Sequence, residues 1–133
     1  MIVADTHALV WLDFHEQPLG AEARAVAEDA WSAGELAVSA ITFWEVAMLL
    51  RKGRLTLEAG ASGWRRELLN LGLREFALDG EVGAAAESLA DFHGDPADRM
   101  IVATALYRGA VLLTADRSIL SWPGTLDRID ARR

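Results

Sequence analysis

The clearest strand signal in the chain is the stretch Gly109–Asp116, which reads GAVLLTAD. Gly109 ends the segment before it, and Val111–Thr114 is a short apolar run with the length and composition of a buried strand. Asp116 follows two residues later and precedes a short helical turn to Leu120. The stretch therefore predicts a buried strand whose carboxyl end leads directly to an acid.

Other short apolar runs predict further strands, and helical segments separate them. The predicted strands are Ile2–Ala4, Leu36–Ser39, Glu75–Leu78 and a last one near Arg128–Asp130. Apolar spacing and cap residues predict helices at Ala21–Trp31, Thr42–Leu50, Gly60–Asn70, Gly80–Ala90 and Pro96–Tyr107. Strands that alternate with helices imply βαβ units. The expected fold class is α/β, with a mostly parallel sheet of four to five strands flanked by helices on both faces.

Length and composition predict a single domain over residues 1–133, because 52% of the residues are hydrophobic and 25% are charged. No apolar run approaches the roughly 18–20 residues that span a bilayer, and the first residues lack signal-peptide features. A cytoplasmic protein without a membrane segment is therefore expected. The chain has no cysteine, which excludes a disulfide scaffold, a thiolate zinc site and a cysteine nucleophile.

Four acidic residues occupy equivalent places around the predicted sheet. Asp5 ends the first strand and Asp116 follows the strand Val111–Thr114, whereas Glu45 and Asp98 lie in the first turns of two helices. In an open parallel sheet these places share the edge at which the strands end, where ligand sites form. Four carboxylates distant in sequence are therefore expected to converge there.

Converging carboxylates repel one another, and a divalent cation would neutralise them. Mg²⁺ and Mn²⁺ prefer such oxygen ligands. A bound cation of this kind supports phosphodiester hydrolysis, because it lowers the pKa of water and offsets charge in the transition state. It would also help a chain of net charge −7 to accept a polyanion.

Each acid also has a local structural interpretation. Thr42 and Glu45 have the spacing of a capping box, and Asp98 is an acid in a first helical turn. Asp116 could initiate the turn after its strand. Asp5 ends an apolar strand, where an unpaired anion would be costly to bury. The joint arrangement favours the metal-site interpretation over these alternatives.

Nearby polar residues receive weaker assignments. Thr114 could hold the metal-bound water or an acidic ligand, or it could be structural. Asp95 is interpreted as a helix cap before Pro96. Arg99 could contact a phosphate or pair with a neighbouring acid, and pairing is favoured. No catalytic role is assigned to any histidine, namely His7, His15 or His93.

Two kinds of surface remain as candidates for binding a partner. The basic clusters Arg51–Arg54 and Arg65–Arg66 could follow a polyanion or could be ordinary exposed helix ends. A set of large apolar residues could form plain core or a groove for a partner helix: Trp11, Phe14, Trp44 and Met48.

Four segments, in their order along the chain, resemble one known family. They are Asp5–Trp11 (DTHALVW), Ser39–Ala47 with its WEVA ending, Asp95–Ile101 (DPADRMI) and Leu113–Asp116 (LTAD). Together they resemble PIN-domain ribonucleases, specifically VapC toxins of type II toxin–antitoxin systems. The resemblance runs from residue 1 into the last strand. It departs at Ala97, where the family often has an aromatic residue.

The resemblance implies an Mg²⁺- or Mn²⁺-dependent endoribonuclease that hydrolyses RNA phosphodiester bonds. It further implies a homodimer, inhibited by a cognate VapB antitoxin whose C-terminal segment occupies the active groove. The family's acidic quartet falls on Asp5, Glu45, Asp98 and Asp116, as catalytic and metal-binding residues. Asp5 and Asp98 would then be the principal ligands, with Glu45 and Asp116 completing the shell.

Two other classes of protein remain as alternatives. A phosphotransfer receiver domain has a similar size and an acidic pocket, but it needs a lysine beyond a late strand, and Lys52 is the only lysine here. A non-catalytic module could keep the same fold for dimerisation or regulation. The complete set of four acids argues against that second alternative.

Overall fold

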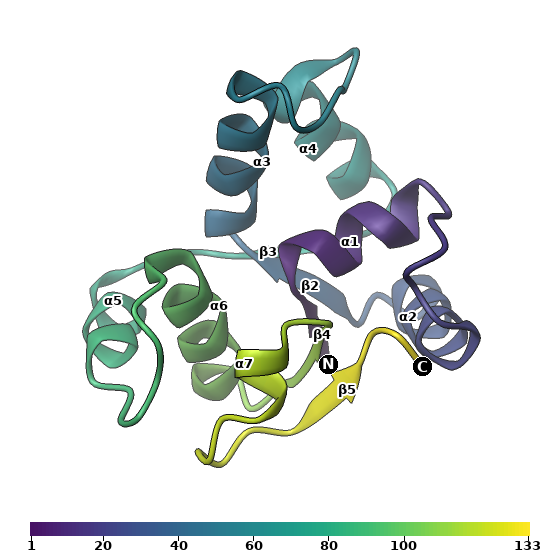
Figure 1. The fold of residues 1–133 in the computed structure, drawn as a ribbon. Helices are drawn as coiled ribbons and strands as arrows, with labels where there is room; N and C mark the ends of the chain where they lie inside the picture. The colour runs from purple at the N-terminus through teal and green to yellow at the C-terminus, as the bar shows by residue number, and fades with distance from the viewer.

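The computed structural model describes residues 1–133, and its strands form one sheet (Figure 1). The strands are β1 (Ile2–Ala4), β2 (Leu36–Ser39), β3 (Arg74–Phe76), β4 (Val111–Thr114) and β5 (Arg128–Asp130). The helices are α1 (Thr6–Asp13), α2 (Ala21–Ser32), α3 (Ile41–Arg51), α4 (Gly60–Asn70), α5 (Gly80–Glu87), α6 (Pro96–Tyr107) and α7 (Arg117–Leu120). No helix is both long and apolar enough to cross a membrane.

The sheet has the order β3-β2-β1-β4-β5, and every neighbouring pair of strands is parallel. The first strand therefore lies in the middle, with Val3 opposite Ala37 of β2 on one side and Leu112 of β4 on the other. Parallel pairing confirms the predicted α/β class. It also places the carboxyl ends of all five strands along one edge.

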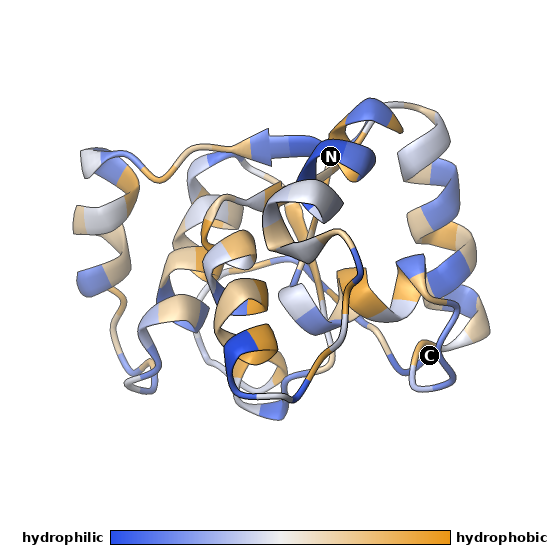
Figure 2. Cartoon of the chain, turned by 90° about the horizontal axis from the view of Figure 1, so that it is seen from above, coloured by the Kyte–Doolittle hydropathy of each residue, from blue (hydrophilic) through white to orange (hydrophobic).

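Alternation along the strands gives the sheet two buried faces. Val3, Ala37 and Leu112 point to one face, which α6 and α7 cover. Their neighbours Ala4 and Leu113 point to the opposite face, which α1, α2, α3 and α4 cover. Figure 1 shows these helices on either side of the strands, and Figure 2 shows the hydrophobic residues gathered toward the centre. This three-layer arrangement explains the continuous apolar character of the central strands.

Two predicted elements differ from the structure by two or three residues at one end. The third strand begins one residue earlier than predicted and ends at Phe76 instead of Leu78, because Phe76 pairs with Ser39, the last residue of β2. Beyond that point no neighbouring strand is left to pair with. Helix α5 ends at Glu87 instead of Ala90, whose carbonyl accepts a hydrogen bond from the Trp122 indole.

Candidate active site

The four predicted acids line one cleft at the edge where the strands end. Asp5 follows β1, Asp116 follows β4, Glu45 lies on α3 and Asp98 on α6. The cleft encloses about 340 Å³, room for a hydrated cation together with part of a substrate. The residues that complete its lining are His7, Trp11, Asp95, Ala115 and Arg132.

Asp5 and Asp116 are joined through one buried threonine. The Thr114 hydroxyl donates to Oδ2 of Asp5 at 2.7 Å and accepts from the backbone N–H of Asp116 at 3.0 Å. The other oxygen of Asp5 accepts from the N–H of Thr6 at 2.8 Å. Asp116 also caps α7, since its Oδ1 accepts from the N–H of Ile119. Asp116 therefore combines the turn-forming role and a place in the cleft.

Glu45 is held by a threonine of α1 and not by a capping box. Helix α3 begins at Ile41 with Ala40 as its cap, so the prediction that Thr42 caps it is wrong. Thr42 is buried, and its hydroxyl lies 3.0 Å from that of Thr6. The Thr6 hydroxyl in turn donates to Oε1 of Glu45 at 2.5 Å. The contact of the buried Thr42 with Thr6 of α1 replaces the local capping pattern, and the Thr6 hydroxyl holds Glu45 at the cleft.

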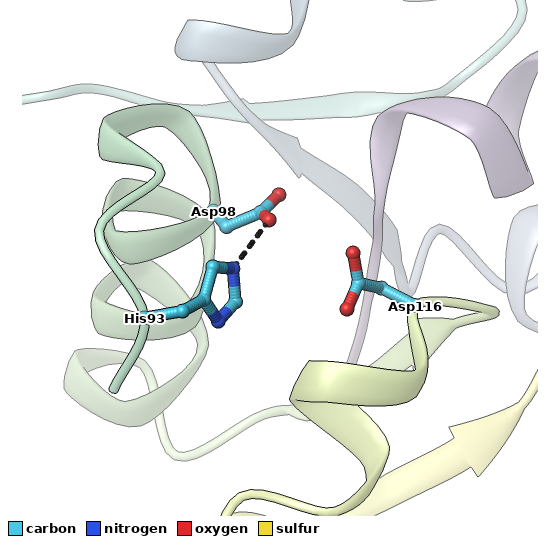
Figure 3. A group of neighbouring side chains, drawn as sticks. All are labelled: His93, Asp98 and Asp116. Atoms are coloured by element: carbon cyan, nitrogen blue, oxygen red, sulfur yellow. Dashed lines mark hydrogen bonds and ion pairs between the residues drawn. The ribbon is translucent and has the colours of Figure 1, made fainter. Parts of the chain in front are cut away.

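Asp98 receives a contact from a histidine in the preceding loop. Nε2 of His93 lies 2.8 Å from Oδ2 of Asp98, and Figure 3 shows Asp98 and Asp116 on opposite sides of the same space, with the imidazole beside them. Asp95 caps α6 as predicted, because its carboxylate accepts from the N–H of Asp98 at 3.1 Å. The cap fixes the first turn of α6, from which Asp98 projects.

Burial and mutual repulsion raise the pKa values of three of these acids. Burial is the larger cause for Glu45, whose pKa rises to about 7, and for Asp98, whose pKa rises to about 6. The hydrogen bonds from Thr6 and His93 oppose these shifts, and the neighbouring carboxylates add to them. Burial also raises the pKa of Asp5, against the hydrogen bonds from Thr114 and Thr6. Ionising several carboxylates in this cleft is unfavourable unless a positive charge is close, so the site is suited to a cation.

The donor set fits a divalent metal ion. Ligand atoms of His93, Asp98 and Asp116 all lie within 4.8 Å of one another, so one ion could contact all three. Asp5 presents carboxylate oxygens to the same cleft and is 7% exposed. Oxygen donors with at most one imidazole are typical of Mg²⁺ and Mn²⁺ sites and unlike the sulfur-rich sets of structural zinc.

Comparison with known proteins assigns the family. The family model of the PIN domain matches residues 2–122. The chain belongs to the PIN domain family. It is also 36% identical over 121 residues to Ribonuclease VapC22 of Mycobacterium tuberculosis, an alignment that covers 90% of each protein.

Solved structures share the fold of this PIN domain at low sequence identity. One is a toxin–antitoxin complex from Klebsiella pneumoniae, with 19% identity, a TM-score of 0.66 and 98% of each chain covered. Another is VapBC2 from Rickettsia felis bound to a DNA fragment from its promoter, with 14% identity, a TM-score of 0.65 and 98% of each chain covered. A third is FitAcB from Neisseria gonorrhoeae, with 21% identity, a TM-score of 0.63 and 98% of each chain covered.

One arginine of the PIN domain differs from its favoured assignment, and two others form contacts within the protein. Arg99 pairs with no acid, because its guanidinium donates to three backbone carbonyls, those of Ala86, Phe92 and His93. Arg99 therefore holds the loop that carries His93. Arg65 pairs with Glu75 through two hydrogen bonds, at 2.7 and 2.8 Å, and Arg66 donates to Ser62. The Arg65–Arg66 cluster is thus engaged within the protein.

Two residues at the site have no role in the sequence-based expectations. Arg132 lines the cleft, and His93 lies beside it in contact with Asp98. A signal existed for Arg132, since it lies two residues beyond β5, as Asp116 lies two residues beyond β4. The same rule that found the acids would have placed this cation beside them. No comparable signal marks His93, because tertiary contacts of its loop determine where it lies.

Proposed function

We propose that this protein is a divalent-metal-dependent endoribonuclease, acting as the toxin of a VapBC-type pair. The observation that carries the proposal is the convergence of Asp5, Glu45, Asp98 and Asp116 in one cleft. The 36% sequence identity to Ribonuclease VapC22, in an alignment that covers 90% of the chain, supports the proposal. Residues 1–133 would then work as one catalytic domain.

In this proposal Asp5 and Asp98 are the principal metal ligands, and Glu45 and Asp116 complete the shell directly or through water. A bound Mg²⁺ or Mn²⁺ would supply a water of lowered pKa and neutralise charge on the reacting phosphate. The chain itself supplies positioning: Thr114 orients Asp5, Thr6 orients Glu45, and His93 orients Asp98. Such supporting hydrogen bonds hold the ligands in place before substrate arrives.

Glu45 has a second task in the same proposal. With its pKa raised to about 7, part of the metal-free protein carries a proton there at neutral pH. Cation binding requires the carboxylate form, so it would release that proton. Glu45 would therefore be fully ionised only when the cation is bound.

The proposed partners are RNA, a VapB-type antitoxin and a second copy of the chain, in the cytoplasm where translation-related RNA is found. Support comes from two exposed aromatic side chains outside the cleft. Trp44 is 57% exposed and shares a shallow hollow with Met48 and Arg51, and Phe14 is 45% exposed. Both aromatics are available to a protein partner.

Cleavage of cellular RNA by the purified, antitoxin-free protein tests the proposal. RNA is incubated with Mg²⁺, Mn²⁺ or EDTA, and the same reactions are run with Asp5→Asn. We expect discrete cuts with either metal, none in EDTA and none with the variant. Circular dichroism of Asp5→Asn controls for loss of fold.

Two results would overturn the proposal. Cleavage that persists in EDTA or in the folded variant would mean that the acids do not carry the reaction. A folded wild-type protein that neither cuts RNA nor binds Mn²⁺ would favour a non-catalytic regulatory module.

A further inference from the structure

We propose that Arg132 is a substrate-binding residue whose guanidinium holds a phosphate oxygen of the RNA strand in the acidic cleft. The inference rests on the proposed ribonuclease function and names the group that would position the substrate. Arg132 is the only arginine or lysine that lines the cleft.

The backbone around Arg132 is fixed at several points. The N–H of Ala131 donates to the carbonyl of Thr114 at 2.9 Å, and the Ala131 carbonyl accepts from the N–H of Gly20 at 2.8 Å. The Arg133 carbonyl accepts from the N–H of Glu22 at 3.0 Å. Gly20 permits this close approach, because a Cβ there would lie 2.0 Å from the carbonyl carbon of Arg133. Arg132 therefore leaves a fixed stretch of chain at the sheet edge that carries the acids.

The side chain of Arg132 is directed across the mouth of the cleft. Its Cζ lies 5.8 Å from the centre of the Trp11 ring, a cation–π contact, and Nη1 donates to the carbonyl of Ala115. The neighbouring residue Asp116 belongs to the acidic quartet. Arg132 is thus held on two sides while it stays exposed to solvent.

Arg132 retains donors for a ligand. It forms no ion pair with a cleft carboxylate, and its Nε and Nη2 have no acceptor within the protein. A guanidinium with free donors is well matched to phosphate oxygens, to which it can make two parallel hydrogen bonds. The most economical ligand is therefore a phosphodiester group that enters beside the acids.

Charge balance favours the same ligand. Five carboxylates line the cleft, contributed by Asp5, Glu45, Asp95, Asp98 and Asp116. Even with a divalent cation bound, their negative charge would repel a phosphodiester strand. A fixed cation at the rim offsets that repulsion at the point of entry. The chain as a whole carries a net charge of −7, so its overall charge does not attract RNA.

Binding of RNA to a non-cleaving background tests the role of Arg132. Asp5→Asn is combined with Arg132→Ala, Arg132→Gln or Arg132→Lys, and each protein is titrated with a fluorescein-labelled random single-stranded RNA pool in Mg²⁺. A random pool suffices because phosphate contacts carry no sequence information. Arg133→Ala is the matched control, because the adjacent Arg133 lines a different hollow, beside Glu22 and Val26.

We expect Arg132→Ala to weaken RNA binding by about tenfold, as loss of a charge-assisted phosphate contact would. The slope of log affinity against log salt should fall by about 0.7, the value for one phosphate contact to a single strand. Arg132→Lys should keep that slope and part of the affinity, whereas Arg132→Gln should behave as Arg132→Ala. Arg133→Ala should leave both quantities unchanged.

In the cleaving background, Arg132→Ala should raise KM for RNA more than it lowers kcat. A purely structural role predicts instead that Arg132→Gln restores function, because glutamine can still donate to the Ala115 carbonyl. That result, or unchanged affinity and salt slope in Arg132→Ala, would overturn the proposal. Should Arg132→Ala fail to fold, the comparison of Arg132→Gln with Arg132→Lys decides the question.

Failure of the Arg132 proposal is separable from failure of the ribonuclease function. If wild-type protein cleaves RNA with metal and Arg132→Ala does so with an unchanged KM, only the Arg132 proposal is overturned. If wild-type protein neither cleaves RNA nor binds Mn²⁺, the ribonuclease function fails, whereas the titrations in the Asp5→Asn background still decide whether Arg132 binds RNA.

Discussion

The acids of the cleft form two pairs that are held in different ways. The strand-side pair, Asp5 and Asp116, follows two adjacent strands and is joined through the buried Thr114. The helix-side pair, Glu45 and Asp98, projects from α3 and α6, and the pKa values rise to about 7 and about 6. Each helix-side carboxylate has one side-chain partner, Thr6 or His93. The strand-side acids thus share one buried hydrogen-bond partner, whereas the helix-side acids are held by two separate side chains.

Replacing one acid of each pair by its amide gives the largest expected effect. Asp5→Asn and Asp98→Asn should each lower RNA cleavage by about a thousandfold or more, because each removes a proposed metal ligand. Single-turnover cleavage with Mg²⁺ measures the loss.

The two amide variants should differ in metal-free stability. Asp98→Asn relieves repulsion, and its amide oxygen can still accept from His93, so we expect a higher melting temperature in EDTA at pH 8. Asp5→Asn puts an amide donor where both carboxylate oxygens accept hydrogen bonds, which offsets the same relief. Equal melting shifts for the two variants would remove the distinction between the pairs.

Removing the partner of Asp98 gives the next largest effect. His93→Ala should weaken Mn²⁺ binding by about tenfold to a hundredfold, the usual range when a supporting contact to a metal site is lost. Isothermal titration calorimetry measures this affinity. His93→Gln should lose less, because its amide can still donate to Asp98. His15→Ala is a matched control, since His15 contacts Arg24 outside the cleft. If His93→Ala bound Mn²⁺ as tightly as the wild type, the contact with His93 would not be needed to orient Asp98.

Removing the link of the strand-side pair should cost stability as well as activity. Thr114→Val keeps the shape of a fully buried side chain but removes its hydroxyl. We expect the free energy of unfolding to fall by about 1–2 kcal/mol, because Asp5 and the Asp116 N–H each lose a partner. Chemical denaturation measures this change. Thr114→Ser should retain most of the stability, and a stable, active Thr114→Val would mean that the strand-side pair does not need this link.

The last expected effect is a pH dependence of stability to which the helix-side pair contributes, beside the buried Asp5. The folded-state pKa values of Glu45 and Asp98 lie above their ordinary values, so the native protein binds more protons than the unfolded chain between about pH 4 and pH 7. The stability that these groups contribute is fully present below that window and is lost as the pH rises through it.

After allowance for solvent exposure, the loss should reach about 1–2 kcal/mol for the metal-free protein. Urea denaturation in EDTA across the window measures it. Saturating Mg²⁺ should remove the loss, since the cation binds the deprotonated native form. The double variant Glu45→Gln, Asp98→Asn should show a flatter profile. If the free energy of unfolding of that variant changed with pH as steeply as that of the wild type, other groups would cause the effect.

The sequence predicts the strand-side pair more completely than the helix-side pair. Asp5 and Asp116 follow apolar runs that are too short to be helices, and parallel pairing alone brings their positions together. Glu45 and Asp98 are also placed correctly at the sheet edge, but the contacts that orient them are not predictable from local spacing. The capping box expected from Thr42 fails because tertiary packing buries that threonine against Thr6. The catalytic and metal-binding roles of all four acids stay predictions.

Errors elsewhere have the same cause. The end of β3 depends on where β2 stops, and Ala90, which the sequence assigns to α5, contacts the distant Trp122. Arg99 holds the loop that carries His93 through the carbonyls of Phe92 and His93. Local pattern identifies elements and acids, whereas partners distant in sequence set boundaries and side-chain directions.

The central place of β1 has a consequence for synthesis of the protein. The first strand to leave the ribosome pairs with β2 early but waits for β4, residues 111–114, to complete its other edge. Because Asp116 follows β4, the four acids cannot meet until almost the whole chain has emerged. A translation product that ends before β4 would therefore lack the complete cleft. A toxin with this topology would then be inactive until its synthesis is almost complete.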